Sequence, residues 1–343
     1  MRAAPWIAVY RRLLSLLPAF LRDKHGEAMV SLYARELEHA RTKGAWHLAA
    51  AGVAGLYDLL RRSAVESVRA RTDAASAPRM RALGVAFAES TVALTFALLA
   101  LFGGRTLPRL AERGESVATI VEALLLAVPF TIALTLPMAV LLTVLLVRTR
   151  RASRNTAPAR LRGRHGLVPI LASATAVAAL TLVVTTQVVP RTNGRLTNLL
   201  AGGPVETSDR SMTVSALQAA ARATARAGGS DAAARVAAYE VEIHKKYALA
   251  AACLVLAVVG LAITQRAPSG GTLLVVTASC TVYAVYAVLL TGGETLAEQQ
   301  VISPLVGTWS ANALLLTAAL LAMRWHSNAH GPTESEAGGV EAA

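Results

Sequence analysis

The chain has 343 residues, of which 54% are hydrophobic and 16% charged, and its mean hydropathy is +0.48. This composition is more apolar than that of soluble domains, so it excludes an ordinary soluble protein and favours a membrane protein. The net charge of +13 would suit nucleic-acid binding, but the basic residues border apolar runs and no recognition motif accompanies them. We therefore expect no nucleic-acid partner and attribute the charge to the positive-inside pattern of membrane proteins.

The first 81 residues predict a small helical module outside the membrane. They contain 14 Lys and Arg residues, and their longest uncharged stretch, Ala45–Tyr57, is too short to cross a bilayer. Apolar residues recur there with helical spacing, first before Pro18, then up to Gly44, and again up to Leu60. We predict a cytoplasmic helical module over residues 1–81, which either lies on anionic lipid headgroups or is a solvated three-helix domain.

Six apolar runs that follow residue 81 predict six transmembrane helices. The clearest run lies between Glu122 and Arg148, where 25 consecutive residues carry no charge. About 20 apolar residues suffice for a helix to cross a bilayer, and within lipid the backbone must satisfy its own hydrogen bonds. The predicted fold class is therefore an all-α polytopic membrane protein, with spans at residues 82–104, 118–147, 167–190, 247–264, 272–291 and 303–323.

The distribution of basic residues predicts how these spans are oriented. The loop Arg148–His165 carries seven Arg and no acidic residue. Because basic loops stay in the cytoplasm, both termini are predicted to be cytoplasmic. The transmembrane helices then form two blocks, residues 82–190 and 247–325. The Ser-, Gly- and Glu-rich residues 326–343 are predicted to be a disordered cytoplasmic tail.

The segment between the third and fourth spans, residues 191–246, is predicted to be short, helical and periplasmic. It is rich in Ala, with a helix start at Thr213, a stop at Gly228 and Gly229, and a new start at Asp231. We therefore expect two short helices there.

The sequence contains no motif for catalysis or cofactor binding. The phosphate-binding motif GxxxxGK[ST] is absent, and no Ser/His/Asp set, paired carboxylates or metal-ligand pattern stands out. We therefore expect no enzymatic activity, no cofactor and no metal. Any ATP that drives this protein must bind to another subunit.

Ionisable residues close to the spans are the candidates for binding an anionic amphipathic substrate. Glu89 lies inside the first span, where a charge is costly and usually faces a cavity or a partner. It is also close enough to the cytoplasmic end for its side chain to reach the headgroups. Arg105, Arg109, Lys245 and Lys246 border the outer ends of spans, where they could bind phosphate groups or simply anchor the helix ends.

Several sequence segments form a recognisable series in the second part of the chain. The second span, VPFTIALTLPMAVLLTVLLV, has two spaced prolines, the third ends in VVPRTNGRL, and the fourth follows the charged lead-in YEVEIHKK. The most specific segment, GGETLAEQQVISPLVGTWSAN, contains G-E-x-L-A, then P, then W-x-x-N. Together these segments resemble the lipopolysaccharide-export permease family, LptF/LptG. The matching positions are Pro129, Pro137, Pro190, Gly293, Glu294, Pro304, Trp309 and Asn312.

This resemblance implies the permease subunit of an ABC-type exporter. Two six-span permeases, as a homodimer or a heterodimer, would enclose a cavity for lipopolysaccharide or another anionic lipid. A separate ATP-binding cassette ATPase would drive extrusion from the membrane.

The chain departs from the family pattern in three places. Family members carry a periplasmic β-jellyroll between spans three and four, and the roughly 55 residues available here are too few for its eight strands. The loop 148–165 lacks the acidic residue that the family usually carries where it meets the ATPase. Residues 1–81 are extra, and they resemble the helical prefix found before some bacterial permeases.

These departures leave two alternatives open. The chain could be a non-transporting scaffold or regulator of permease ancestry that acts through its cytoplasmic prefix. It could also be an ion-coupled carrier centred on Glu89.

Overall fold

The computed structural model describes residues 4–72, 78–152, 164–201, 209–266 and 271–329. Helices make up the regular structure of these residues, and no strand occurs among them, which confirms the predicted all-α class. Six of the helices are long and apolar enough to cross a membrane: residues 81–106, 118–147, 167–201, 232–265, 273–298 and 304–325. The chain forms two compact units, the N-terminal unit (residues 1–135) and the C-terminal unit (residues 136–343).

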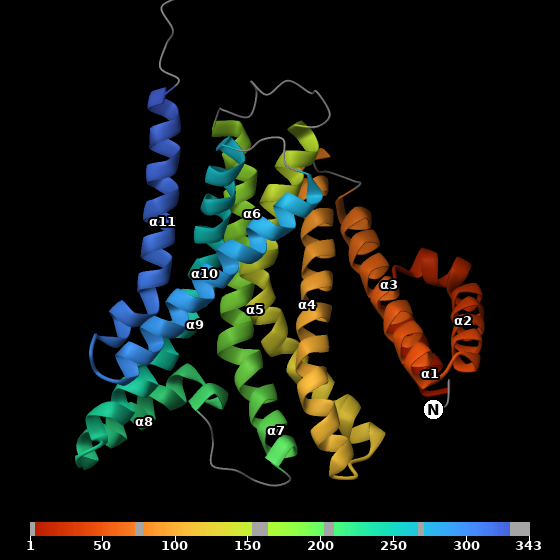
Figure 1. The fold of residues 1–343 in the computed structure, drawn as a ribbon, viewed down its shortest axis with the longest axis horizontal. Helices are drawn as coiled ribbons and strands as arrows, with labels where there is room; N and C mark the ends of the chain where they lie inside the picture. The colour runs from red at the N-terminus through yellow and green to blue at the C-terminus, as the bar shows by residue number, and fades with distance from the viewer. Residues whose placement is uncertain (1–3, 73–77, 153–163, 202–208, 267–270, 330–343) are drawn as a thin grey trace, which may run out of the picture. The chain divides into compact units, whose positions relative to one another are not determined.

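The N-terminal unit contains four helices and the first part of a fifth (Figure 1). Apart from a short 3-10 turn at Leu14–Leu16, they are α1 (Ala4–Leu13), α2 (Ala19–Thr42), α3 (Ala45–Thr72), α4 (Pro78–Glu112) and the residues of α5 (Val117–Ala152) up to Thr135.

Helices α1, α2 and α3 share an apolar core that aromatic residues dominate. The rings of Tyr10 and Tyr33 stack with centroids 4.2 Å apart, and the Tyr33 hydroxyl donates a 2.8 Å hydrogen bond to the carbonyl of Gly52. Burial raises the pKa of the Tyr10 phenol, because the core disfavours its charged form. Around these rings lie the buried side chains of Leu14, Leu17, Val30, Leu37, Leu48 and Leu59.

Helix α3 also lies along the first half of α4. Tyr57 meets Phe96 edge-on, with ring centroids 5.3 Å apart. A Cβ on Gly84 would lie 2.8 Å from Val68, so the two helices are in close contact at that point too. Because the α3 residue number rises from 57 to 68 as its α4 neighbour falls from 96 to 84, the helices run antiparallel. The extra N-terminal segment is thus packed directly on the first candidate span.

The C-terminal unit is built around α9 (Ala232–Arg266). Helices α6 (Arg164–Val183), α8 (Val214–Ala227), α10 (Thr272–Glu298) and α11 (Pro304–Ala329) all pack against α9, and Figure 1 shows it running among them. Within its apolar window 72% of α9 is buried, against 22% for α10 and 28% for α11. Ala248 and Ala252, the small residues of α9 expected to allow close packing, are fully buried.

The third span extends further than its apolar sequence predicts. A π-helical turn, Val184–Val188, connects α6 to α7 (Val189–Ala201), so the helix continues past Pro190. The backbone N–H of Val189 bonds to the carbonyl of Val184, five residues back. Since proline has no N–H to donate, this wider turn lets the chain continue as helix through Pro190.

The segment between spans three and four has the helix signals predicted for it. Thr213 caps α8, and its hydroxyl accepts a 3.3 Å bond from the N–H of Ala216. Gly228 ends α8 with a φ of 67°, a left-handed conformation that glycine adopts readily. The expected second short helix is instead the start of α9, which runs on into the fourth span without a break.

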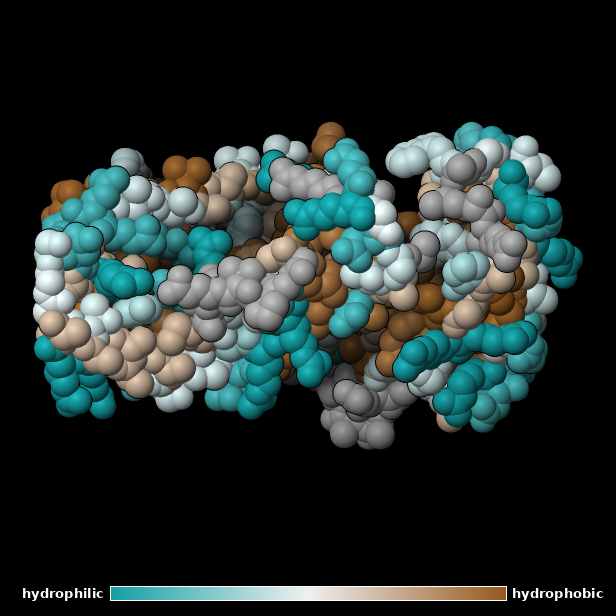
Figure 2. All heavy atoms as spheres, turned by 90° about the horizontal axis from the view of Figure 1, so that it is seen from below, coloured by the Kyte–Doolittle hydropathy of each residue, from teal (hydrophilic) through white to brown (hydrophobic). Residues whose placement is uncertain are grey.

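The end of the C-terminal unit at which α7 and α8 lie is largely hydrophilic on its surface, as the view from below shows (Figure 2). Along the spans, large apolar side chains are exposed instead, among them Leu273, Val288, Leu314 and Leu321. At the C-terminus, α11 continues to Ala329, although the sequence predicts that the disordered tail begins at residue 326. Residues 330–343 lie outside the described residues.

Two glycines in the N-terminal unit should respond in opposite ways to substitution by alanine. A Cβ on Gly55 would lie 2.2 Å from the ring of Tyr33, whereas a Cβ on Gly26 would meet its nearest atom, of Arg22, at 3.7 Å. We expect Gly55→Ala to destabilise the α1–α3 core by about 1–3 kcal/mol through overpacking. Gly26→Ala should stabilise α2 by up to about 1 kcal/mol, because alanine favours the helix.

Hydrogen exchange of α2 and α3 in the full-length protein measures both effects. Faster exchange in Gly55→Ala and slower exchange in Gly26→Ala is the expected result. Equal effects of the two substitutions would contradict the packing of Tyr33 against Gly55.

Candidate functional site

The candidate site lies where α10 and α11 cross next to α9. A Cβ on Gly293 would lie 2.0 Å from the carbonyl oxygen of Gly307, and a Cβ on Gly307 would lie 2.5 Å from that of Gly293. The two backbones are therefore in direct contact, which only glycine permits on both helices. This contact brings the neighbouring side chains of three helices together.

An ion pair joins α9 to α10 beside this crossing. Lys245 donates a 2.7 Å hydrogen bond from Nζ to Oε2 of Glu294, across 49 residues of sequence. The exposed fraction of the Lys245 side chain is 26% and that of Glu294 is 11%. Charge-assisted hydrogen bonds are stronger than neutral ones, and they strengthen further where water is largely excluded.

An amide joins α9 to α11 on the other side of the crossing. Asn312 donates a 2.9 Å hydrogen bond from Nδ2 to the carbonyl of Ala248. Both residues are buried. We call Lys245, Glu294, Asn312 and the Gly293–Gly307 contact the polar clasp, because together they join α9, α10 and α11.

Four buried polar atoms around the polar clasp have no hydrogen-bond partner among the residues that the structure describes. They are the hydroxyl oxygen of Tyr286, Oε1 of Glu294, Nε1 of Trp309 and Oδ1 of Asn312. A buried polar group without a partner costs about 1–3 kcal/mol, so native proteins supply one from water or a ligand. The clasp therefore offers both donors and acceptors to an additional polar group.

The turn between α10 and α11 fixes where Trp309 and Asn312 lie. Gln300 adopts a positive φ of 61°, and the N–H of Val301 returns to the carbonyl of Leu296 at 2.9 Å. Ser303 then precedes Pro304, the first residue of α11, and its carbonyl accepts the N–H of Gly307. Proline suits this first helical position, because the N–H that it lacks would have no helical partner.

Two of the four basic residues predicted at the outer ends of the spans have partners within the protein. Lys245 belongs to the polar clasp. Lys246 is only 4% exposed, and its Nζ lies 3.4 Å from Oε1 of Glu242, one turn earlier on α9. Arg105 is exposed on α4, while the side chain of Arg109 lies outside the described residues.

Glu89 is paired with a residue that the sequence analysis did not predict as its partner. Its Oε1 lies 3.3 Å from Nη1 of Arg61 on α3, and both side chains are partly buried. Arg61 and Glu89 are 28 positions apart in the sequence, and no periodic pattern predicts this pairing. The extra N-terminal segment thus supplies a counter-ion for the carboxylate of the first span.

The remaining family-motif prolines lie inside helices. Pro137 is buried and Pro129 partly buried, and α5 continues as helix through both. Pro190 is buried in α7. No group of three or more His, Cys, Asp or Glu that could hold a metal ion occurs in the part of the chain that the structure describes.

The part of the chain that contains the polar clasp is similar to a known protein family. The family described as lipopolysaccharide export system permease LptF/LptG matches residues 204–325. Residues 204–325 are thus similar to the LptF/LptG permease family. No curated protein matches the chain.

The LptF/LptG match covers α8 to α11 and so contains the whole polar clasp. Gly293, Glu294 and Asn312, which the sequence gives as family-motif residues, are the residues that hold α9, α10 and α11 together. The N-terminal unit lies outside the matched residues.

Two adjacent glycines test the backbone contact. A Cβ on Gly293 would collide with Gly307, whereas a Cβ on Gly292 would meet nothing within 4 Å. We expect Gly293→Ala to destabilise the protein by at least about 1–3 kcal/mol, since backbone cannot move aside as a flexible side chain can. Gly292→Ala should be neutral or slightly stabilising.

Thermal unfolding in detergent compares the two variants under identical conditions. A clear loss of melting temperature in Gly293→Ala alone supports the contact. Equal melting temperatures for both variants would show that α10 and α11 do not touch at Gly293.

Proposed function

We propose that this chain is the permease subunit of an ABC-type exporter that moves an anionic lipid or glycolipid out of the inner membrane. The observation that carries this proposal is that the LptF/LptG segment forms one packed group of helices, α8 to α11, with the family-motif residues at its centre. Six helices of membrane-spanning length support it. ATP hydrolysis would take place in a separate ATPase subunit.

We also propose that both termini lie in the cytoplasm. The arginine-rich residues 148–165 support this orientation through the positive-inside rule. In the same orientation the α10–α11 turn, α7 and α8 would face the periplasm. The polar clasp would then lie at the periplasmic end of the spans, close to the depth of the lipid headgroups.

A second permease subunit would complete the cavity. The outward sides of α10 and α11 expose long apolar side chains, including Leu273, Val288 and Leu321. Such surfaces suit either lipid or another apolar helix. The domain organisation that follows is a cytoplasmic prefix at residues 1–81 and transmembrane blocks at residues 82–190 and 247–325, joined by the helical residues 191–246.

The competing proposal is a scaffold or regulator that does not transport. It is favoured by the absence of strands from the described part of residues 191–246, because a β-jellyroll would dock the chain onto a periplasmic bridge. Recovery of an ATPase separates the two proposals. We expect the full-length chain, purified from its native membrane in mild detergent, to retain an ATP-binding subunit.

Substitution at the outer end of the first span tests the substrate class. In liposomes containing lipopolysaccharide, Arg105→Gln/Arg109→Gln should lower lipid-stimulated ATP hydrolysis by about tenfold, the effect of losing one or two charge-assisted bonds. Arg222→Gln/Arg226→Gln on α8 is the matched control with the same change in charge.

Stimulated hydrolysis in the control and its loss in the test variant would support lipid export. If no ATP-binding subunit co-purifies and lipopolysaccharide does not stimulate hydrolysis, the chain is a scaffold and the export proposal is wrong.

A further inference from the structure

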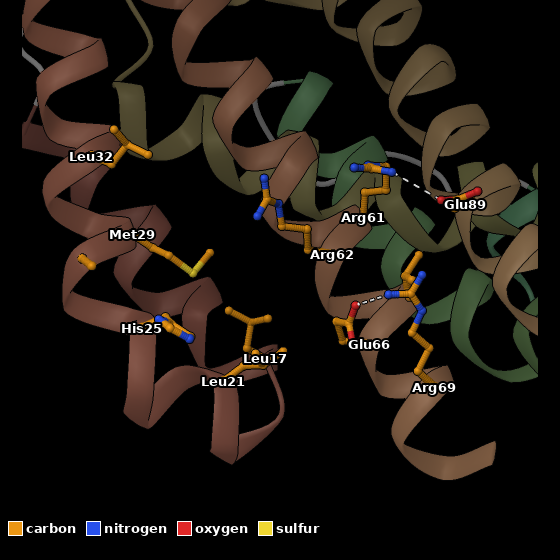
Figure 3. A pocket seen from close by; sticks show the side chains of 12 residues that line it. Leu17, Leu21, His25, Met29, Leu32, Arg61, Arg62, Glu66, Arg69 and Glu89 are labelled. Atoms are coloured by element: carbon orange, nitrogen blue, oxygen red, sulfur yellow. Dashed lines mark hydrogen bonds and ion pairs between the residues drawn. The ribbon is translucent and has the colours of Figure 1, made fainter. Parts of the chain in front are cut away.

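A hollow of about 600 Å³ opens between α2 and α3 in the N-terminal unit (Figure 3). Its volume is in the range of small-molecule and cofactor sites. It lies at the open end of the α2–α3 hairpin, away from the turn at Gly44, and Glu89 of α4 also contributes to its lining. It lies outside the residues that match the LptF/LptG family.

The two sides of this hollow have different chemistry. The side that comes from α2 and the turn before it is mainly apolar, with Leu17, Leu21, Ala28, Met29 and Leu32, and it also includes His25. The opposite side comes from α3 and carries Arg61, Arg62 and Arg69 together with Glu66. Figure 3 shows the apolar side chains and these charged groups on opposite sides of the same space.

Arg62 and Arg69 of the hollow form ion pairs with carboxylates of the same helix, and a bound anion can replace these carboxylates. Arg62 contacts Asp58 through Nε at 2.7 Å, and Arg69 contacts Glu66 at 2.7 Å. The side chains of Arg62 and Arg69 are exposed, and ion pairs at exposed positions contribute little to stability. A guanidinium has five N–H donors in a fork that fits phosphate, so each arginine can bind a phosphate without losing its structural role.

The hollow is also next to apolar surface that suits a membrane. Its lining residue Glu89 belongs to the candidate span that runs from Arg81 to Thr106. Leu16 and Phe20, which immediately precede the lining residues Leu17 and Leu21, are 52% and 60% exposed. A ligand could therefore enter from the bilayer with an acyl chain leading.

We propose that this hollow binds one anionic phospholipid from the surrounding bilayer. An acyl chain lies against the apolar side formed by α2, and the phosphate is bound by Arg62 and Arg69, while Arg61 remains paired with Glu89. An occupant with only a phosphate would leave the apolar side in water, and one with only an acyl chain would leave the arginines without an anion. This site is independent of what the spans transport.

Photocrosslinking in a membrane tests the proposal. The full-length protein is reconstituted in phosphatidylcholine liposomes that contain a phosphatidylglycerol with a photoactivatable group in its acyl chain, and crosslinked peptides are mapped by mass spectrometry. We expect crosslinks on α2, at or near Met29 and Leu32. Arg62→Gln/Arg69→Gln should lower their yield by at least about tenfold, the change in affinity that follows from losing even one charge-assisted bond.

Two controls separate this site from general attraction to a basic surface. Arg11→Gln/Arg35→Gln removes the same charge from exposed positions of the same helical module and should leave the yield unchanged. Leu32→Gln, at an exposed position on the apolar side, should lower the yield while leaving Arg62 and Arg69 intact.

Three results would overturn the proposal. The first is an equal loss of crosslinking in Arg11→Gln/Arg35→Gln, which would indicate attraction to the surface alone. The second is an equal yield with a photoactivatable phosphatidylcholine, which would show that the anionic headgroup is not selected. The third is displacement of the probe by soluble glycerol phosphate, which would identify a water-soluble phosphate ligand instead.

Discussion

The close approach of Gly293 and Gly307 is the constraint on which the C-terminal unit depends. In a bilayer no hydrophobic effect drives helices together, so packing and hydrogen bonds between helices must do so. The carbonyl oxygen of Gly307 occupies the space that a Cβ on residue 293 would need. This close contact between α10 and α11 places Glu294 and Asn312 where they can reach α9. The family-motif residues are thus explained first by how three helices join, and only then by transport.

The N-terminal unit uses a different kind of interaction to attach the prefix to a span. Helix α3 lies antiparallel along α4, with an aromatic pair at Tyr57 and Phe96 and an ion pair at Arg61 and Glu89. A carboxylate inside a span is costly unless it is paired or reaches water. The pairing gives the extra segment a physical role in the first span, and one of its two residues, Glu89, also lines the hollow between α2 and α3.

Much of the fold follows from local sequence signals. Apolar runs of sufficient length predict all six spans, and Thr213 and Gly228 mark the ends of α8 because capping depends on neighbouring residues alone. Hydropathy predicts that the third span ends at Pro190, because the sequence becomes polar after that residue. The helix nevertheless continues to Ala201, because a π-helical turn precedes Pro190. The fourth helix likewise starts before its apolar run does.

The candidate site was only partly predictable, for a physical reason. The resemblance identified Gly293, Glu294 and Asn312, but their partners lie 49 and 64 residues away and share no sequence period with them. The position of Lys245 at the end of a span predicts either phosphate binding or an anchor for the helix end, whereas the structure pairs it with Glu294. Position along a helix can be predicted from hydropathy, but the facing residue depends on tertiary packing.

Exchange of the two charges of the Lys245–Glu294 pair is the most direct test of the polar clasp. Lys245→Glu and Glu294→Lys, each alone, place like charges together in a largely buried position, and each should cost about 3 kcal/mol of stability in detergent. The double variant Lys245→Glu/Glu294→Lys should recover at least half of the summed loss, because the pair is restored with its direction reversed. Losses that simply add in the double variant would show that these two residues do not interact and would contradict the account of how α9 and α10 are joined.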